Sequence, residues 1–114
     1  MLLCLPLDGS APELLEPLKD VTVVVPKQAV LKCEINPGEP PAKVRFFKEL
    51  KEIYSGAQYD ISLENGSIQL TIRSTELSDG AKFRCEAANK LGTIECEAKL
   101  IVHGECFISI LHGD

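Results

Sequence analysis

The five cysteines of this 114-residue chain are the residues whose chemistry is most evident: Cys4, Cys33, Cys85, Cys96 and Cys106. Thiols bind zinc as thiolates, or they form and exchange disulfides when two of them lie close together. A structural zinc site needs four ligands with short paired spacings. These cysteines are widely spaced, and His103 with Cys106 makes only a weak H-x-x-C pair. We therefore expect no metal site, and thiol exchange remains a candidate.

Nucleophilic catalysis requires a base within hydrogen-bond reach of a serine or cysteine. The only histidines, His103 and His112, lie beyond the last predicted strand, and the sequence contains no glycine-rich phosphate loop. We expect a protein that is not an enzyme and that binds no cofactor.

Cys33 and Cys85 each lie in the middle of a segment in which every second residue is apolar. The first segment places Cys33 between Leu31 and Ile35, and the second places Cys85 between Phe83 and Ala87. A period of two puts these side chains on one face of a strand. The cysteines are 52 residues apart (85 − 33), and Phe46 follows the first by 13 (46 − 33). This arrangement predicts two sheets that meet across a core holding both sulfurs and aromatic rings from Phe46 and Phe83.

The rest of the chain supplies further short strands and no helical periodicity. We predict strands at 12–17, 21–25, 29–35, 44–48, 52–54, 59–63, 68–72, 81–88 and 94–102. Prolines confine the first of these to a sheet edge. Asn65-Gly66 predicts a tight hairpin turn, and residues 75–80 form a polar corner with one short helical turn. An all-β sandwich follows.

Composition is that of one ordinary globular domain, with 45% hydrophobic and 25% charged residues. The net charge of −5 disfavours nucleic acid and anionic membranes as partners, because both require a cationic surface. We predict a disordered leader at 1–11, one domain at 12–102, and a tail or the start of a linker at 103–114.

Several motifs together are typical of a known family. They are Glu16-Pro17-Leu18-Lys19-Asp20-Val21, Val30-Leu31-Lys32-Cys33, Val44-Arg45-Phe46, Leu70-Thr71-Ile72, Asp79 ahead of Phe83-Arg84-Cys85, and Leu91-Gly92. As a set they resemble the I-set immunoglobulin-like domains of intracellular muscle and cytoskeletal proteins, the group of titin, obscurin, myosin-binding protein C and palladin. The resemblance implies an immunoglobulin-like Greek-key sandwich of two antiparallel sheets.

Three positions depart from that family's pattern. Phe46 stands where tryptophan is usual, and Phe83 stands where a tyrosine hydroxyl is usually tied to upstream backbone, so two polar contacts are lost while aromatic packing remains. Ala81 stands where glycine is usual, and alanine cannot adopt a positive φ cheaply. We expect ordinary or modest stability for the class.

The resemblance also implies a function. It is that of a structural and protein-protein interaction module in a large sarcomeric or cytoskeletal protein, acting in the cytoplasm as an elastic spacer and docking surface. Its partners would be other such domains, reached by edge-strand pairing, and neighbouring immunoglobulin or fibronectin-type domains of the same chain. The candidate partner edge combines two segments that run side by side in this family: Val21, Val23, Val25, Ile94 and Cys96.

Two alternatives stay open. The domain would instead be an extracellular adhesion or receptor domain if Cys33 and Cys85 formed a disulfide and Asn65 carried a glycan. The odd cysteine count and the short, proline-interrupted apolar start at residues 1–7, which lacks a basic segment, weigh against this. For Cys33, Cys85 and Cys96, the resemblance implies a trio able to exchange disulfides, whereas burial predicts inert thiols.

Overall fold

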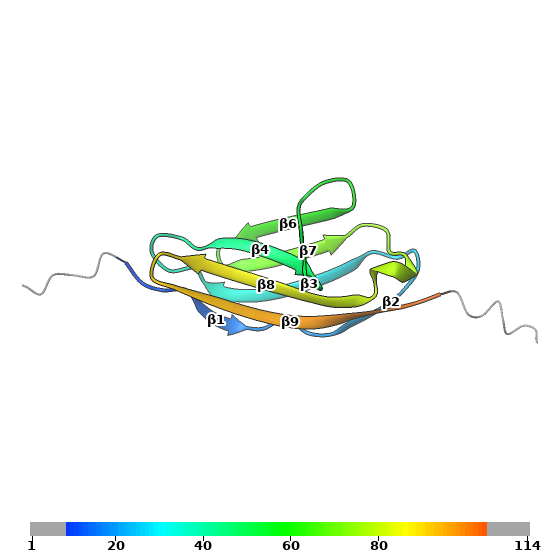
Figure 1. The fold of residues 1–114 in the computed structure, drawn as a ribbon, viewed down its shortest axis with the longest axis horizontal. Coiled ribbons are helices and arrows are strands. Elements are labelled where there is room, and N and C mark those ends of the chain that lie inside the picture. Colours follow the sequence, from blue (N-terminus) through cyan, green and yellow to red (C-terminus); the bar gives the residue numbers. More distant parts are fainter. Residues whose placement is uncertain (1–8, 105–114) are drawn as a thin grey trace, which may run out of the picture.

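In a computed structural model, which describes residues 9–104, the chain forms two β-sheets that lie face to face (Figure 1). The strands are β1 (Glu13–Glu16), β2 (Val21–Val24), β3 (Ala29–Asn36), β4 (Lys43–Lys48), β5 (Lys51–Ile53), β6 (Tyr59–Glu64), β7 (Ser67–Ile72), β8 (Ala81–Asn89) and β9 (Gly92–His103). A single 3₁₀ turn, η1 (Leu77–Asp79), lies within the described residues. The predicted all-β sandwich is confirmed.

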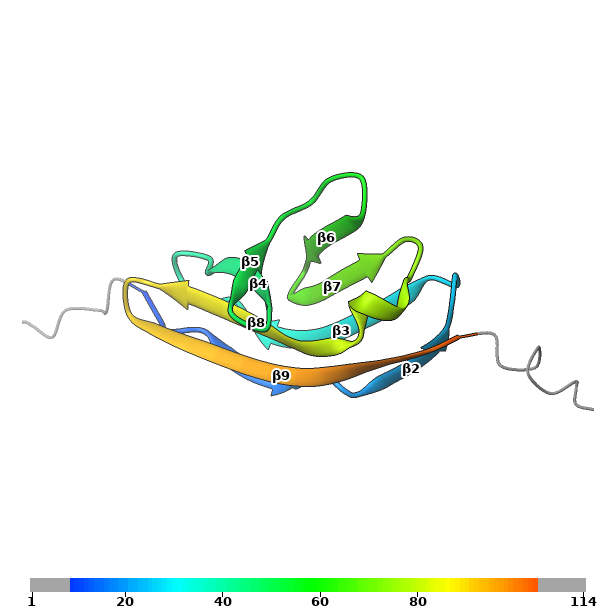
Figure 2. The ribbon, with the colours of Figure 1, turned by 45° about the vertical axis from the view of Figure 1, so that its right-hand side comes forward.

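One sheet has four strands in the order β1-β3-β7-β6, and the other has five in the order β2-β9-β8-β4-β5. Neighbouring strands are antiparallel except for β2 and β9, which are parallel from Val21 opposite Leu100 to Val24 opposite His103. Figure 2 shows β2 alongside the last part of β9. The chain therefore crosses between the sheets after β1, because β1 pairs with β3 and β2 pairs with β9.

The core follows from the alternation along the strands. Burial in β3 strictly alternates, with Ala29, Leu31, Cys33 and Ile35 buried and their neighbours more exposed. The predicted core residues occupy this layer: Cys33, Phe46, Phe83 and Cys85 are at most 3% exposed. Beside β3 in the same sheet, Ile68, Leu70 and Ile72 of β7 are fully buried. Removal of this apolar surface from water is the main force that holds the sheets together.

The predicted hairpin and polar corner are both present. Asn65 and Gly66 have φ angles of 53° and 84° between β6 and β7, as a type I′ turn requires. At the corner, Asp79 is the last residue of η1 and is buried, and its Oδ2 accepts a hydrogen bond from the Glu76 backbone N–H at 2.8 Å. Its Oδ1 accepts one from Gln58 at 3.0 Å and lies 3.7 Å from the Lys48 ammonium, so the buried carboxylate is satisfied.

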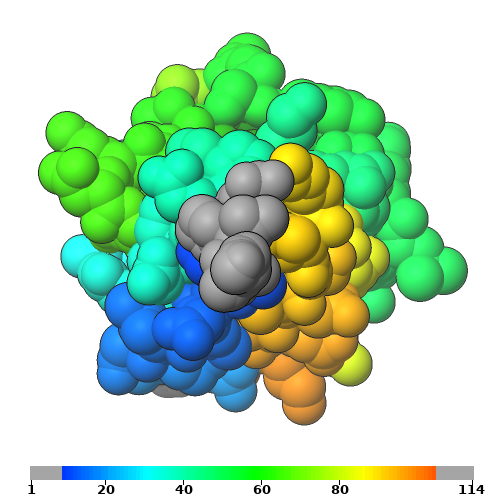
Figure 3. Space-filling view, turned by 90° about the vertical axis from the view of Figure 1, so that its left-hand side faces the viewer, coloured from blue at the N-terminus to red at the C-terminus, as the bar shows by residue number. Residues whose placement is uncertain are grey.

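The described N-terminal segment is held between two loops at one end of the sandwich, where Figure 3 shows it (blue) beside neighbouring segments in cyan and yellow. Ser10 and Glu39 exchange backbone hydrogen bonds of 2.8 and 3.0 Å. The Asn89 amide donates to the carbonyls of Ser10 and Pro40 and accepts from the N–H groups of Leu91 and Gly92. One side chain thereby ties three segments together.

Residues 1–8 and 105–114, which include Cys4, Cys106 and His112, lie outside the described residues. The predicted leader at 1–11 and tail at 103–114 stay predictions; Ser10 and His103 take part in the pairings described above. No helix among the described residues is long and apolar enough to span a membrane.

Candidate functional site

The sulfurs of Cys33 and Cys85 meet in the core. Cys33 lies on β3 and Cys85 on β8, and their Sγ atoms are 3.9 Å apart as free thiols. Cys85 is flanked in its sheet by two paired residues. Phe46 of β4 lies beside it on one side, and Cys96 of β9 lies beside it on the other. Cys96 is half-buried. The sequence-predicted trio is thus brought together, beside one of the two core aromatics.

The environment of Cys33 and Cys96 keeps these two thiols protonated. Hydrogen bonding to the Cys85 thiol, together with burial, raises the pKa of Cys33 to about 12. Hydrogen bonding to Cys33, followed by burial, raises the pKa of Cys96 well above its usual range. Because the thiolate is the reactive form, both groups are poor nucleophiles at neutral pH. Among residues 9–104, no cluster of three or more His, Cys, Asp or Glu side chains is placed to hold a metal ion.

The side chains of the candidate partner edge are not exposed to solvent in the way that a docking surface requires. Val23 is buried and Val21, Val25, Ile94 and Cys96 are half-buried, so all five side chains are at least partly withdrawn from solvent. The apolar side chains exposed on the same two strands are Val24 and Ile101, at 41% and 40%. A partner at this edge would meet backbone and these two residues. The sequence missed them because alternation does not say which outward apolar residues remain uncovered.

The edge of β9 is only partly covered. β2 pairs with β9 from Leu100 onward, and just before this ladder the Asp20 carboxylate accepts a hydrogen bond from the Lys99 N–H at 2.8 Å. Among the described strands, β8 is the only one that pairs with Thr93–Ala98. On its other side this stretch has no pairing strand among the described residues, although β1 comes close to β9.

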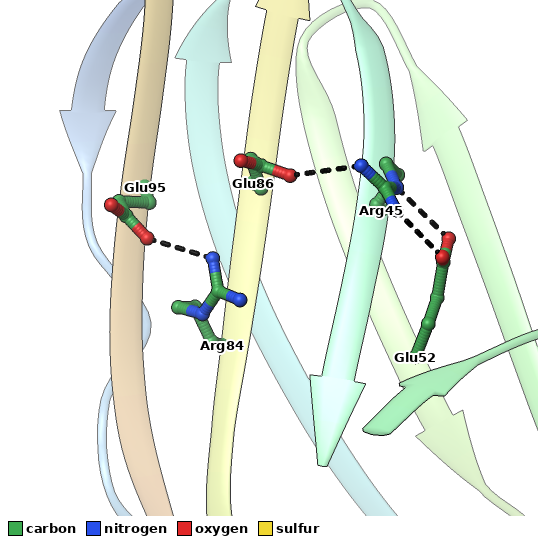
Figure 4. Close-up of polar contacts among 5 residues, drawn as sticks. All are labelled: Arg45, Glu52, Arg84, Glu86 and Glu95. Carbon is green, nitrogen blue, oxygen red and sulfur yellow. Dashed lines mark hydrogen bonds and ion pairs between the residues drawn. The ribbon is translucent and has the colours of Figure 1, made fainter. Parts of the chain in front are cut away.

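The outer face of the five-stranded sheet carries a ladder of ion pairs (Figure 4). Arg45 makes two hydrogen bonds to Glu52, at 2.8 and 3.0 Å, and approaches Glu86 at 3.5 Å. Arg84 bonds Glu95 at 2.8 Å. The Arg45 hydrogen bond lowers the pKa of Glu52, and Glu52 in turn raises the pKa of Arg45.

Phe47 lies at the centre of this ladder. The guanidinium carbons of Arg84 and Arg45 are 4.1 and 5.1 Å from its ring centroid, within cation–π range. Sequence reasoning could not find the ladder. The pairing depends on the register between β4, β8 and β9.

Comparisons with known proteins agree with this geometry. The chain is 37% identical over 93 residues to the muscle M-line assembly protein unc-89 of Caenorhabditis elegans, covering 81% of this chain and 1% of that protein. It is 36% identical over 97 residues to smooth muscle myosin light chain kinase of Gallus gallus, covering 85% of this chain and 5% of that protein. The chain thus spans only a small part of the curated relatives it matches.

Solved structures of titin domains are similar to the fold. A titin domain at atomic resolution superposes with a TM-score of 0.80 at 29% identity, covering 85% of this chain and 97% of that one. A chain in a complex of titin with an obscurin-like 1 immunoglobulin domain gives a TM-score of 0.79 at 25% identity, covering 83% and 96%.

A family model, the immunoglobulin I-set domain, matches residues 12–102, which carry both core cysteines, both core aromatics and all nine strands except the end of β9. The family's fold is non-catalytic, and the match to the kinase covers only a small fraction of that enzyme. The chain belongs to the immunoglobulin I-set family.

Proposed function

We propose that this domain is a non-catalytic structural and protein-protein interaction module of a large multidomain sarcomeric or cytoskeletal protein. In this role it is an elastic spacer in the cytoplasm, linked to neighbouring immunoglobulin or fibronectin-type domains. It also docks other sarcomeric or cytoskeletal domains by edge-strand pairing. The muscle proteins among its relatives support this setting.

The parallel ladder between β2 and β9 is the observation that carries the spacer role. The described chain enters at one end of the sandwich and leaves at the other (Figure 1). Tension on the two ends pulls β2 and β9 past each other in opposite directions, because the strands are parallel and lie near opposite chain ends. Their hydrogen bonds are then loaded together in shear, which resists extension better than opening them one at a time.

The docking role rests on the free stretch of β9. Backbone groups at an open strand edge pair with an extended partner strand, and Val24 and Ile101 add exposed apolar surface nearby. Val21, Val23, Val25, Ile94 and Cys96 support this edge from inside the sandwich.

The spacer role predicts that the Asp20 carboxylate contributes to mechanical strength. Asp20→Ala removes the hydrogen bond to the Lys99 N–H at the start of the ladder, a contribution of about 1 kcal/mol. In single-molecule pulling from both chain ends, Asp20→Ala should unfold at lower force than the wild type. Asp60→Ala, which changes an exposed carboxylate on β6, is the matched control and should leave the force unchanged. Equal forces for all three proteins would contradict the proposal.

A further inference from the structure

A groove of about 580 Å³ lies where the chain crosses from one sheet to the other. β1 pairs only with the end of β3, at residues 34–36, and then turns away at Pro17 toward the opposite sheet. The first half of β3 is thus left with a strand on one side only, since β7 pairs with β3 along its other edge. The groove runs beside this uncovered half.

The backbone of Val30 and Lys32 faces the groove. In an antiparallel strand, the N–H and C=O groups of one residue point to the same side, and the side alternates with each residue. The Ile35 N–H donates to Gly66 on the β7 side, so odd residues of β3 point there. Even residues point the other way, where Glu34 and Asn36 meet β1. No strand within residues 9–104 pairs with Val30 and Lys32 on that side.

The groove also has an apolar floor between charged walls. The apolar lining residues are Leu15, Pro17, Val21, Val30 and Cys33. Leu15 is 61% exposed, at the point where the β1–β3 register shifts. The walls are two ion pairs, Glu16 with Lys19 and Lys32 with Glu34, each at 3.9 Å on exposed side chains. Such exposed pairs are weak, so an incoming charge can displace one member.

The net charge of the four-stranded sheet indicates which sign of charge a partner in the groove should carry. The four strands of this sheet carry five acidic residues (Glu13, Glu16, Glu34, Asp60 and Glu64) and one basic residue, Lys32, a net of −4 (1 − 5). The opposite sheet carries seven basic and four acidic residues, a net of +3 (7 − 4). The groove lining itself is neutral, with Glu16 and Glu34 against Lys19 and Lys32, so the charge of the surrounding strands favours a cationic segment on this sheet over the other sheet.

We propose that this groove binds an extended basic segment of another protein. The segment adds a strand to β3 by bonding the backbone of Val30 and Lys32, and it seats an aliphatic side chain against Leu15 and Val21. Its lysine or arginine side chains lie near Glu16 and Glu34. The site deepens the docking role proposed above and rests on it, but it is separate from the β9 edge.

A peptide titration followed by amide NMR tests the proposal. The probe is a short synthetic peptide of alternating lysine and valine. It should shift the amide signals of Val30 and Lys32, and these two amides should exchange with solvent faster than those of Leu31 and Cys33 in the free protein. A peptide of alternating glutamate and valine should bind about tenfold more weakly, as should a lysine–valine peptide N-methylated on the pairing amides.

Two charge reversals provide the matched comparison. Glu34→Lys should weaken binding about fivefold, whereas Glu64→Lys, with the same change in net charge on the far strand, should weaken it less than about twofold. Equal effects of the two variants, or equal binding of the acidic peptide, would overturn the basic partner. Self-association of the free protein through the same amides would show that a second copy is the occupant instead. Shifts confined to Thr93–Ala98 would overturn the groove while leaving the β9 docking role intact.

Discussion

At the scale of single residues, the cysteines behave as small apolar side chains. Cys33 and Cys85 lie within van der Waals distance as thiols, at 3.9 Å, in a core that excludes water. The raised pKa values of Cys33 and Cys96 mean that little thiolate is present at neutral pH. Of the two interpretations that the sequence left open, the burial of Cys33 and the raised pKa values of Cys33 and Cys96 favour inert thiols.

Thiol labelling should therefore depend on folding. With iodoacetamide at pH 8, Cys33 and Cys96 should react about tenfold or more slowly in the folded protein than in denaturant, as read by peptide mass mapping. Peptide mapping is needed because the chain contains five cysteines. Fast modification of Cys33 in the folded protein would contradict the account.

The raised pKa of Cys33 predicts that the folded protein loses stability at alkaline pH. The folded-state pKa of Cys33, about 12, lies above its ordinary value of 9.0. Its contribution to the free energy of unfolding is therefore full below pH 9 and declines as the pH rises toward 12, because the unfolded state ionises first. Denaturant midpoints measured from pH 8 to about 11 should fall more steeply for the wild type than for Cys33→Ala.

The alternation of apolar residues along the strands correctly predicted which side chains are buried. Cys33, Phe46, Phe83 and Cys85 are buried as the pattern required. The concern over Ala81 was wrong. Among the described residues, positive φ angles outside glycine occur at Glu49 and Asn65, and Ala81 is the first residue of β8. Its β-carbon therefore imposes no left-handed strain.

At the scale of elements, the β6–β7 hairpin depends on a glycine whose replacement is costly. Gly66 has a φ of 84°, and a β-carbon there would lie 2.4 Å from the Ile35 carbonyl oxygen. That carbonyl belongs to β3, so the turn packs directly against the neighbouring strand. The Asn65-Gly66 pair is thus explained by turn geometry, although Asn65 itself is exposed.

Gly66→Ala should lower the free energy of unfolding by about 2 kcal/mol, from left-handed strain and the clash with Ile35. Gly56→Ala is the matched control, because a β-carbon at Gly56 meets no atom within 4 Å and its φ is not positive. Chemical denaturation of both variants measures the difference. A Gly66→Ala loss no larger than that of Gly56→Ala would refute the role given to this turn.

The sequence predicts the strands, but it does not predict the register in which they pair. The sequence indicates which face each side chain takes, but not how far β2 extends along β9 or where β1 leaves β3. Both boundaries result from tertiary packing, and they determine which backbone edges stay free. The ladder around Phe47 and the groove beside Val30 were missed for this reason.

At the scale of the whole molecule, charge and connectivity are both asymmetric. The strands of the four-stranded sheet carry a net charge of −4 and those of the five-stranded sheet a net charge of +3. Along the other direction, the described chain ends lie at opposite ends of the sandwich (Figure 1). Both asymmetries support the proposed load-bearing and docking roles.

The direction of pulling tests the load-bearing claim most directly. Force applied to both chain ends shears the β2–β9 ladder. Force applied between an attachment at Lys27, the exposed residue that closes the turn after β2, and the C-terminal end peels the ladder open from the Val25–His103 hydrogen bond. We predict that end-to-end pulling requires about twofold more force than peeling for the same domain at the same loading rate. Equal unfolding forces in the two directions would contradict the claim that this parallel ladder bears the load.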